Sequence, residues 1–167
     1  QITSYPYLET FNSGIGDWTQ GSGDDGDWVL DNNGTPTAAT GPSDDVTGGE
    51  NYFFTESSTN GSPGEIGSNA TAYLESPCFD LAGLSLAFFN FNYHMYGATM
   101  GSLTLEISDD NGTNWTNIFS ASGDLGDSWQ ASTTDLSSYL GSIVKFRFIG
   151  TTGNGFESDM AIDHISI

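Results

Sequence analysis

Short runs of alternating apolar and polar residues recur along the chain, separated by clusters rich in Gly, Asn, Asp and Ser. In Ser102–Ser108, for example, three aliphatic residues take one face and polar residues take the other. A period of two residues indicates a β-strand with one buried face, and helical periodicity is almost absent. The same pattern predicts further strands at Tyr7–Phe11, Asp27–Leu30, Tyr52–Thr55, Thr71–Glu75, Leu86–Tyr96, Asn114–Phe119, Trp129–Thr134, Ser142–Ile149 and Met160–Ile167.

Ten or eleven short strands with turn signals between them predict an all-β fold, an antiparallel two-sheet sandwich. Asn111-Gly112 supplies the positive-φ residues of a tight hairpin turn. The stretch Thr55–Ala70 is predicted to be one long loop, because it is rich in Gly, Ser and Asn. With 167 residues, we expect a single domain over residues 1–167.

The charge of the chain narrows the possible partners. There are 22 acidic residues against 2 basic ones, a formal net charge of −20. Two cations cannot neutralise a phosphate backbone, so nucleic-acid binding is excluded, and an anionic membrane surface would repel the chain. No apolar run approaches the roughly 20 residues that a spanning helix needs, so we expect no membrane insertion.

The single cysteine, Cys78, cannot form a disulfide within the chain, so the domain must be held together by its core or by a metal. Gln1 begins the sequence without a leader pattern. We therefore expect a module of a longer, secreted protein.

Seven sequence blocks, in order, point to one family. The segment Tyr93-His94-Met95-Tyr96-Gly97, followed by Met100-Gly101, closely resembles the MAM domain family, named for meprin, the A5 protein and receptor phosphatase mu. The other blocks that resemble this family are Leu8-Glu9 with Gly16-Asp17-Trp18, Gly26-Asp27-Trp28, Gly41-Pro42 through Tyr52, Leu74-Glu75-Ser76-Pro77, Ser122 through Trp129, and Asp159 through Ile165.

This resemblance implies a jelly-roll sandwich with a cation site, no catalysis of its own, and, in animal members, a role in cell or protein adhesion. The sequence also departs from the family. Phe88 stands where one of four cysteines is expected, Val46 replaces a histidine, and Cys78 has no partner. A cysteine-poor, acidic chain of this kind is similar to the bacterial MAM-like modules attached to secreted enzymes and surface proteins.

Asp163 points to a metal on separate grounds. If its strand alternates, Asp163 shares the apolar face with Ala161 and Ile165, and a buried carboxylate needs a partner. Lys145 and Arg147 are the only basic side chains, so Ca²⁺, which takes oxygen ligands, fits best. The predicted ligands are Glu9, Asp27, Asp45 and Asp163, with Asp24, Asp25, Asp44 and Asp159 as substitutes if the register differs by one. The alternative is that these acids are solvated at the surface.

No motif indicates catalysis. There is no Gly-x-Ser-x-Gly elbow and no His-Glu-x-x-His zinc motif. The many acids leave a glycosidase-type carboxylate pair open, but the family resemblance argues against it. We expect a binding protein rather than an enzyme.

Aromatic rings can stack on sugars. The candidates are Tyr96 and Trp115, and Tyr52 and Trp28 are further candidates. For each, packing in the core is the alternative. A polar stripe on one strand, Asn90, Asn92 and His94, would line a groove for an oligosaccharide or would bond to an overlying loop.

Together these features predict a non-catalytic, calcium-stabilised recognition module of a secreted bacterial protein. Its expected partner is a neutral or weakly charged polysaccharide, to which it would target an attached enzyme. The alternatives are adhesion to a surface protein, as in animal relatives, and a passive spacer.

Overall fold

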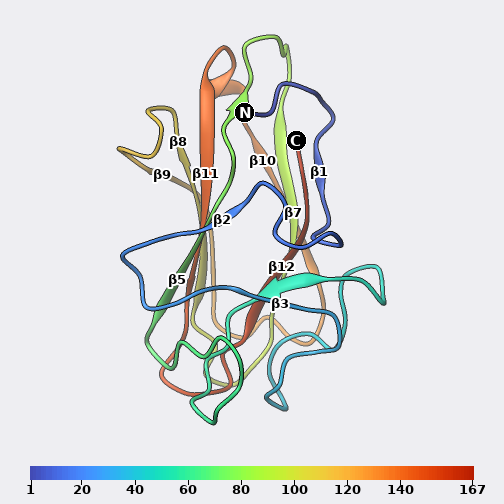
Figure 1. The fold of residues 1–167 in the computed structure, drawn as a ribbon, viewed down its shortest axis with the longest axis vertical. Helices are drawn as coiled ribbons and strands as arrows, with labels where there is room; N and C mark the ends of the chain where they lie inside the picture. The colour runs from blue at the N-terminus through green and yellow to red at the C-terminus, as the bar shows by residue number, and fades with distance from the viewer.

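The computed structural model describes residues 1–167 as two packed β-sheets with almost no helix (Figure 1). Every strand pair is antiparallel. The elements are β1 (Leu8–Glu9), β2 (Thr19–Gln20), β3 (Val29–Asp31), β4 (Tyr52–Phe54), β5 (Thr71–Glu75), β6 (Phe79–Asp80), β7 (Phe88–Met95), β8 (Ser102–Ser108), β9 (Thr116–Ser122), β10 (Gln130–Asp135), the 3-10 turn η1 (Ser137–Tyr139), β11 (Ile143–Thr151) and β12 (Met160–Ser166).

The first sheet has the order β10-β7-β12-β4-β3, with β1 beside β12, and the second has the order β2-β5-β11-β8-β9, with β6 beside β11. Apart from β3 with β4 and β8 with β9, neighbours within a sheet are not consecutive in sequence, because the chain passes from one sheet to the other, as at β4 to β5 and at β7 to β8. The predicted all-β antiparallel jelly-roll sandwich is confirmed.

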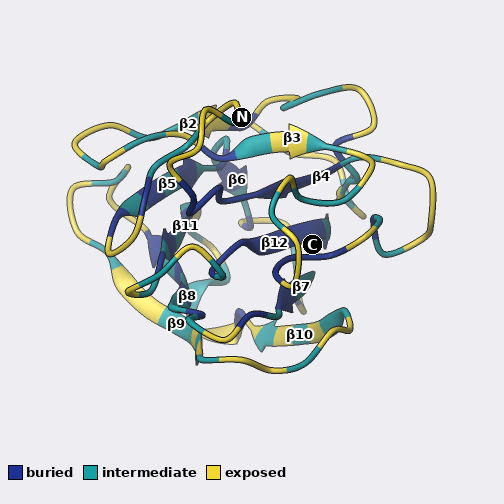
Figure 2. Ribbon diagram, turned by 90° about the horizontal axis from the view of Figure 1, so that it is seen from below, coloured by how far each residue is buried: buried dark blue, intermediate teal, exposed yellow.

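Phenylalanine rings join the two sheets. The Phe89 ring on β7 lies 4.3 Å from that of Phe146 on β11, and the Phe91 ring lies 5.0 Å from that of Phe148. All four are at most 1% exposed, and burying each such side chain stabilises the fold by roughly 1.5–3 kcal/mol. Figure 2 shows the consequence: the central strands are buried, while the edge strands β9 and β10 are largely exposed.

Several elements differ from the sequence expectation. Strands β2 and β6 have two residues each and η1 has three, which is too short for any periodicity to be visible. Asn111 and Gly112 have the expected positive φ, 60° and 86°. The predicted hairpin joins β8 to β9, but its connection, residues 109–115, is longer than a tight two-residue turn.

The last strand does not alternate as expected. The register of β12 against β7 shifts between Asp163 and Ser166, and His164 has φ of 50°. This bulge turns Ile165 into the main core, whereas Ala161 packs on the opposite face with Tyr52 and Phe54. Asp163 is therefore buried as predicted but does not share a face with Ile165.

Both termini lie in the upper half of the view in Figure 1, and the long loops on either side of β4 gather toward its lower end. The only helical turn has three residues, so the structure contains no helix that could cross a membrane.

Candidate functional site

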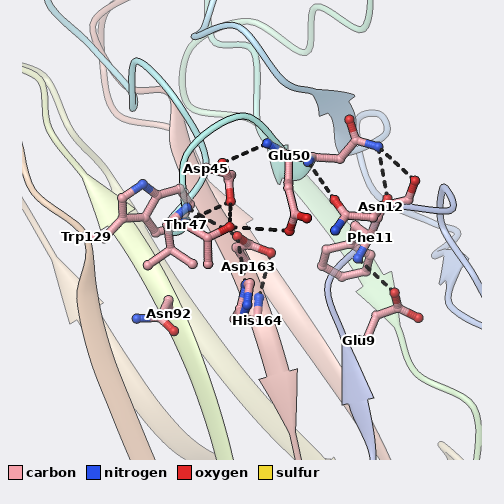
Figure 3. Close-up of polar contacts among 12 residues, drawn as sticks. Glu9, Phe11, Asn12, Asp45, Thr47, Glu50, Asn92, Trp129, Asp163 and His164 are labelled. Atoms are coloured by element: carbon pink, nitrogen blue, oxygen red, sulfur yellow. Dashed lines mark hydrogen bonds and ion pairs between the residues drawn. The ribbon is translucent and has the colours of Figure 1, made fainter.

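The loop between β3 and β4 docks on β12 through the Asp163 side chain (Figure 3). Asp163 is fully buried, and its Oδ1 accepts a hydrogen bond of 2.7 Å from the His164 backbone. Its Oδ2 accepts one of 3.4 Å from the Val46 backbone and lies 3.2 Å from Nδ1 of the His164 ring. Burial raises the pKa of Asp163, even though these bonds pull it down.

Asp45 organises the same loop. Its carboxylate accepts hydrogen bonds from the Thr47 backbone at 2.8 Å, from the Thr47 hydroxyl, and from the Glu50 backbone at 2.9 Å. Burial alone would raise the pKa of Asp45, but these donors lower it to about 2. The sequence predicted a metal as the partner of the Asp45 and Asp163 carboxylates. In the structure, hydrogen-bond donors of the chain itself contact both carboxylates.

The other two predicted ligands lie elsewhere. Glu9 on β1 is the cross-strand partner of Ile165, which faces the core. The Oε1 atom of Glu9 accepts a 2.8 Å hydrogen bond from the Phe11 backbone, and the Glu9 side chain points away from Asp45 and Asp163 in Figure 3. Asp27 is exposed, next to Gly26, which bridges to β5 in the second sheet. No group of three or more His, Cys, Asp or Glu side chains is arranged to hold a metal. The four-ligand set stays a prediction, of which the structure brings only Asp45 and Asp163 together.

The predicted polar stripe lies on the outer face of the first sheet. Asn90 accepts a 2.9 Å bond from Thr133, and Asn92 donates to the Gln130 carbonyl at 3.3 Å. Both asparagines remain partly exposed.

His94 is closed off from solvent, in contrast to the asparagines. It is 2% exposed, its ring lies 5.5 Å from that of Trp129, and its Nε2 lies 3.2 Å from Asp127. Burial lowers the pKa of His94, while Asp127 acts in the opposite direction. Residues of an overlying loop therefore cover the His94 end of the stripe, which is the alternative to a groove.

Three adjoining hollows follow residues 33–45, the loop after β3. The middle hollow, of about 270 Å³, is lined by Tyr96 and small polar residues. It shares Pro42, Ser43 and Asp127 with a hollow of about 130 Å³ beside Trp129. On its other side it shares Thr37 and Ala38 with one of about 450 Å³ beside Phe156. We call these three hollows together, bordered in turn by Trp129, Tyr96 and Phe156, the aromatic groove.

The wall of the aromatic groove is fixed to the sandwich. The Thr40 hydroxyl donates to the Tyr96 carbonyl at 3.0 Å and accepts a bond of 2.9 Å from the Asp159 backbone. Gly97 follows Tyr96 with φ of 150°, and a Cβ there would lie 2.3 Å from the Glu157 carbonyl oxygen. Only glycine permits this approach of the two segments.

The remaining aromatic candidates lie outside the groove. The guanidinium carbon of Arg147 lies 4.3 Å from the ring centroid of Trp115 and 4.7 Å from that of Tyr73, on the outer face of the second sheet. Trp28 and Tyr52 are 2% and 0% exposed, so they pack inside the protein. Sequence reasoning found Tyr96 but not Phe156, which is 59% exposed and whose only signal was an aromatic residue in a glycine-rich segment.

Two packed antiparallel sheets define a β-sandwich domain, and solved structures share this fold. The K1 cleaved adhesin domain of Lys-gingipain from Porphyromonas gingivalis W83 has a TM-score of 0.69 at 18% identity, over 98% of this chain and 97% of that one. TmCBM61 in complex with β-1,4-galactotriose has a TM-score of 0.56 at 15% identity, over 98% and 97% of the two chains. At these identities the likeness establishes the fold alone.

The sequence matches the MAM domain family (meprin/A5/mu) over residues 10–167, and the chain belongs to that family. It is 33% identical over 157 residues to MAM domain-containing glycosylphosphatidylinositol anchor protein 1 of Rattus norvegicus, covering 90% of this chain and 16% of the relative. It is 32% identical over 181 aligned positions to MAM domain-containing glycosylphosphatidylinositol anchor protein 2 of Homo sapiens. This match covers 97% of this chain and 18% of the relative. The chain thus spans less than a fifth of the length of these relatives.

Proposed function

We propose that this chain is a non-catalytic recognition module that binds one strand of a neutral or weakly charged polysaccharide along the aromatic groove. In this proposal it belongs to a secreted bacterial protein and holds an attached enzyme at its polymeric substrate. Membership of the MAM family and the adhesin and carbohydrate-binding folds that the structure resembles support a binding role outside the cell.

The observation that supports the proposal most is that each of three adjoining hollows has an aromatic residue at its border. Trp129, Tyr96 and Phe156 each border one of three hollows that share lining residues. Sugar rings stack on aromatic faces, and their hydroxyl groups need donors and acceptors beside the ring. Asn33, Thr35 and Ser43 line the middle hollow, and polar residues of this kind carry such groups.

The negative charge of the groove and of the whole chain limits the class of polymer that would bind. Asp44, Asp45 and Asp127 line the Trp129 end of the groove, and the chain as a whole carries a formal charge of −20. Sulfated polymers would be repelled. A uronate polymer would bind only through bridging Ca²⁺.

Affinity electrophoresis in gels that contain single polysaccharides tests this proposal. Galactan and xylan are the first choices, because structures of similar fold are described as bound to β-1,4-galactotriose and as a xylan-binding domain. We expect retardation on one neutral polymer and its loss in Tyr96→Ala. Trp115→Ala, which changes an aromatic residue outside the groove, should retain it. Loss in Trp115→Ala instead would place the binding face on the second sheet.

A calcium ion as a structural cofactor is a separate part of the proposal. Its support is the excess of acids over bases, since only two basic side chains are available for 22 carboxylates. Melting curves with added Ca²⁺ and with EDTA test it. A melting temperature that is equal in both would remove calcium from the proposal and leave glycan recognition intact.

Adhesion is the second candidate function, and the outer face of the first sheet favours it. Leu8 and Leu86 are both 61% exposed and Phe88 is 36% exposed. Leu8 lies in one cross-strand row with Ser166 and Asn90, and Phe88 follows on the same face of β7. The occupant would be a second copy of this chain. Self-association in sedimentation velocity, lost in Phe88→Ser, supports adhesion, whereas a monomer that binds no glycan would be a passive spacer.

A further inference from the structure

Two carboxylates inside the fold lack partners on one side. Glu56 and Asp159 are both fully buried. Glu56 Oε1 accepts a 2.8 Å bond from the Ser58 backbone, and Asp159 Oδ1 accepts bonds of 2.9 Å and 3.0 Å from the Ser57 backbone and hydroxyl. The second oxygens, Glu56 Oε2 and Asp159 Oδ2, have no hydrogen-bond partner. Buried polar atoms are nearly always paired, so two such oxygens require an explanation.

The charge on this pair is also unbalanced. The pKa of Asp159 is raised to about 7, chiefly by burial and also by the neighbouring charge of Glu56, against the hydrogen bonds from Ser57 and the opposing effect of the Thr35 side chain. The two basic side chains of the protein lie elsewhere, because Lys145 pairs with Glu75 and Arg147 with Glu106 on the second sheet. Neither lysine nor arginine is therefore available to neutralise Glu56 and Asp159.

Two further hydroxyl groups lack hydrogen-bond partners. The Ser58 hydroxyl is 4% exposed and has no hydrogen-bond partner, and the Thr37 hydroxyl is likewise unpaired. Both residues line the hollow beside Phe156. Carboxylate and hydroxyl oxygens together are ligands for a hard cation, and water and carbonyl groups commonly complete its shell.

We propose that Glu56 and Asp159 bind one hard cation, Ca²⁺ in the first instance, through their unpartnered carboxylate oxygens, with the Ser58 hydroxyl as a further ligand. This inference deepens the calcium dependence proposed above by naming different ligands from the predicted set. Asp45 and Asp163 do not need the ion, because the chain already supplies donors to them.

The position of the cation connects it to the aromatic groove. The backbone of Asp159 donates to Thr40, whose hydroxyl bonds to the Tyr96 carbonyl. Ser58 and Thr37 border the Phe156 end of the groove. A cation held by Glu56 and Asp159 would therefore fix residues 33–45 and residues 55–60 against β12 and keep the groove in shape.

Calorimetric titration of the chelator-treated protein with CaCl₂ tests the site, with MgCl₂ and NaCl as separate titrations. We expect one Ca²⁺ per chain and a loss of at least about tenfold in affinity in Glu56→Gln and in Asp159→Asn. Glu65→Gln is the matched control, since Glu65 lies in the same segment and bonds to the Asn60, Gly61 and Ser62 backbone at the surface. It should bind Ca²⁺ as the wild type does.

Thermal melts show whether each variant folds and whether Ca²⁺ stabilises it. Saturating Ca²⁺ should raise the melting temperature of the wild type by about 5–10 °C. The Glu56→Gln/Asp159→Asn double variant has lost the buried charge, so it should fold without metal and melt at the same temperature in CaCl₂ and EDTA. Ca²⁺ binding that survives in this variant but is lost in Asp163→Asn would overturn the site and preserve the calcium dependence. A wild type that binds none of the three cations would overturn both.

Discussion

The Val46 amide and the Asp163 carboxylate, 117 positions apart in the sequence, meet at 3.4 Å and join the loop before β4 to the last strand. Asp163 faces this loop because the bulge in β12 separates its side chain from that of Ile165. The bond sits at the Trp129 end of the aromatic groove, where Asp45 also lines the wall.

Replacing Asp163 should cost stability through these bonds. Asp163→Ala removes the acceptor for the Val46 and His164 amides, and hydrogen bonds to a charged group are worth about 1.5–3 kcal/mol. We expect a loss of about 3 kcal/mol in the free energy of unfolding, measured by urea denaturation. Asp163→Asn, which keeps an acceptor, should lose less. Equal losses in both variants would mean that the charge of Asp163, and not its geometry, is what matters.

The approach of Gly97 to Glu157 predicts a steric limit. Gly97→Ala would place a Cβ 2.3 Å from the Glu157 carbonyl oxygen, and we expect a loss of more than about 2 kcal/mol together with weaker glycan binding. Gly123→Ala is the control, because it has φ of 77° but no atom within 4 Å of the new Cβ. It should cost only about 1 kcal/mol of backbone strain. Similar losses for both would show that backbone strain alone limits Gly97.

The turn between β8 and β9 should respond to acid. Hydrogen bonds from the Asn114 backbone and side chain and from Ser108 lower the pKa of Asp110 to about 2. A group whose pKa is lower in the folded state stabilises that state above its unfolded pKa, near 4, and loses this effect as the pH falls toward 2. The Asn114 amide signal should move through this range in NMR spectra. In Asp110→Asn the movement should vanish, and its persistence would assign the titration to another group.

Arg147 is predicted to be structural. It stacks between Trp115 and Tyr73 and pairs with Glu106, with Nη2 at 2.6 Å from Oε2. Arg147→Ala should lower the free energy of unfolding by about 1–2 kcal/mol and leave retardation on the polysaccharide unchanged. Lys145→Ala, which breaks only the ion pair with Glu75, should cost less. Lost retardation in Arg147→Ala would make this face a ligand site.

The alternation of apolar residues was sufficient to predict the long strands, because each has one face on the core. Leu103, Leu105, Phe146 and Phe148 are buried as their spacing indicates. Two-residue strands such as β2 and β6 are fixed by their neighbours, and no local pattern reveals them.

The candidate site was harder to predict, for a physical reason. Burial of Asp163 could be inferred from its apolar neighbours, but the bulge that separates it from Glu9 depends on the pairing of β12 with β7 and β1. The donors that satisfy Asp45 and Asp163 are mostly backbone amides, which every sequence contains. Glu56 was not found at all, since only the fold shows that its segment is buried against Asp159.

Chemical-shift mapping with an oligosaccharide from the polymer that retards the chain tests the central claim most directly. The account predicts that shift changes in the labelled protein concentrate in residues 33–45 and around Tyr96, Trp129 and Phe156, along the aromatic groove. Changes centred on Tyr73, Trp115 and Arg147 of the second sheet would contradict it.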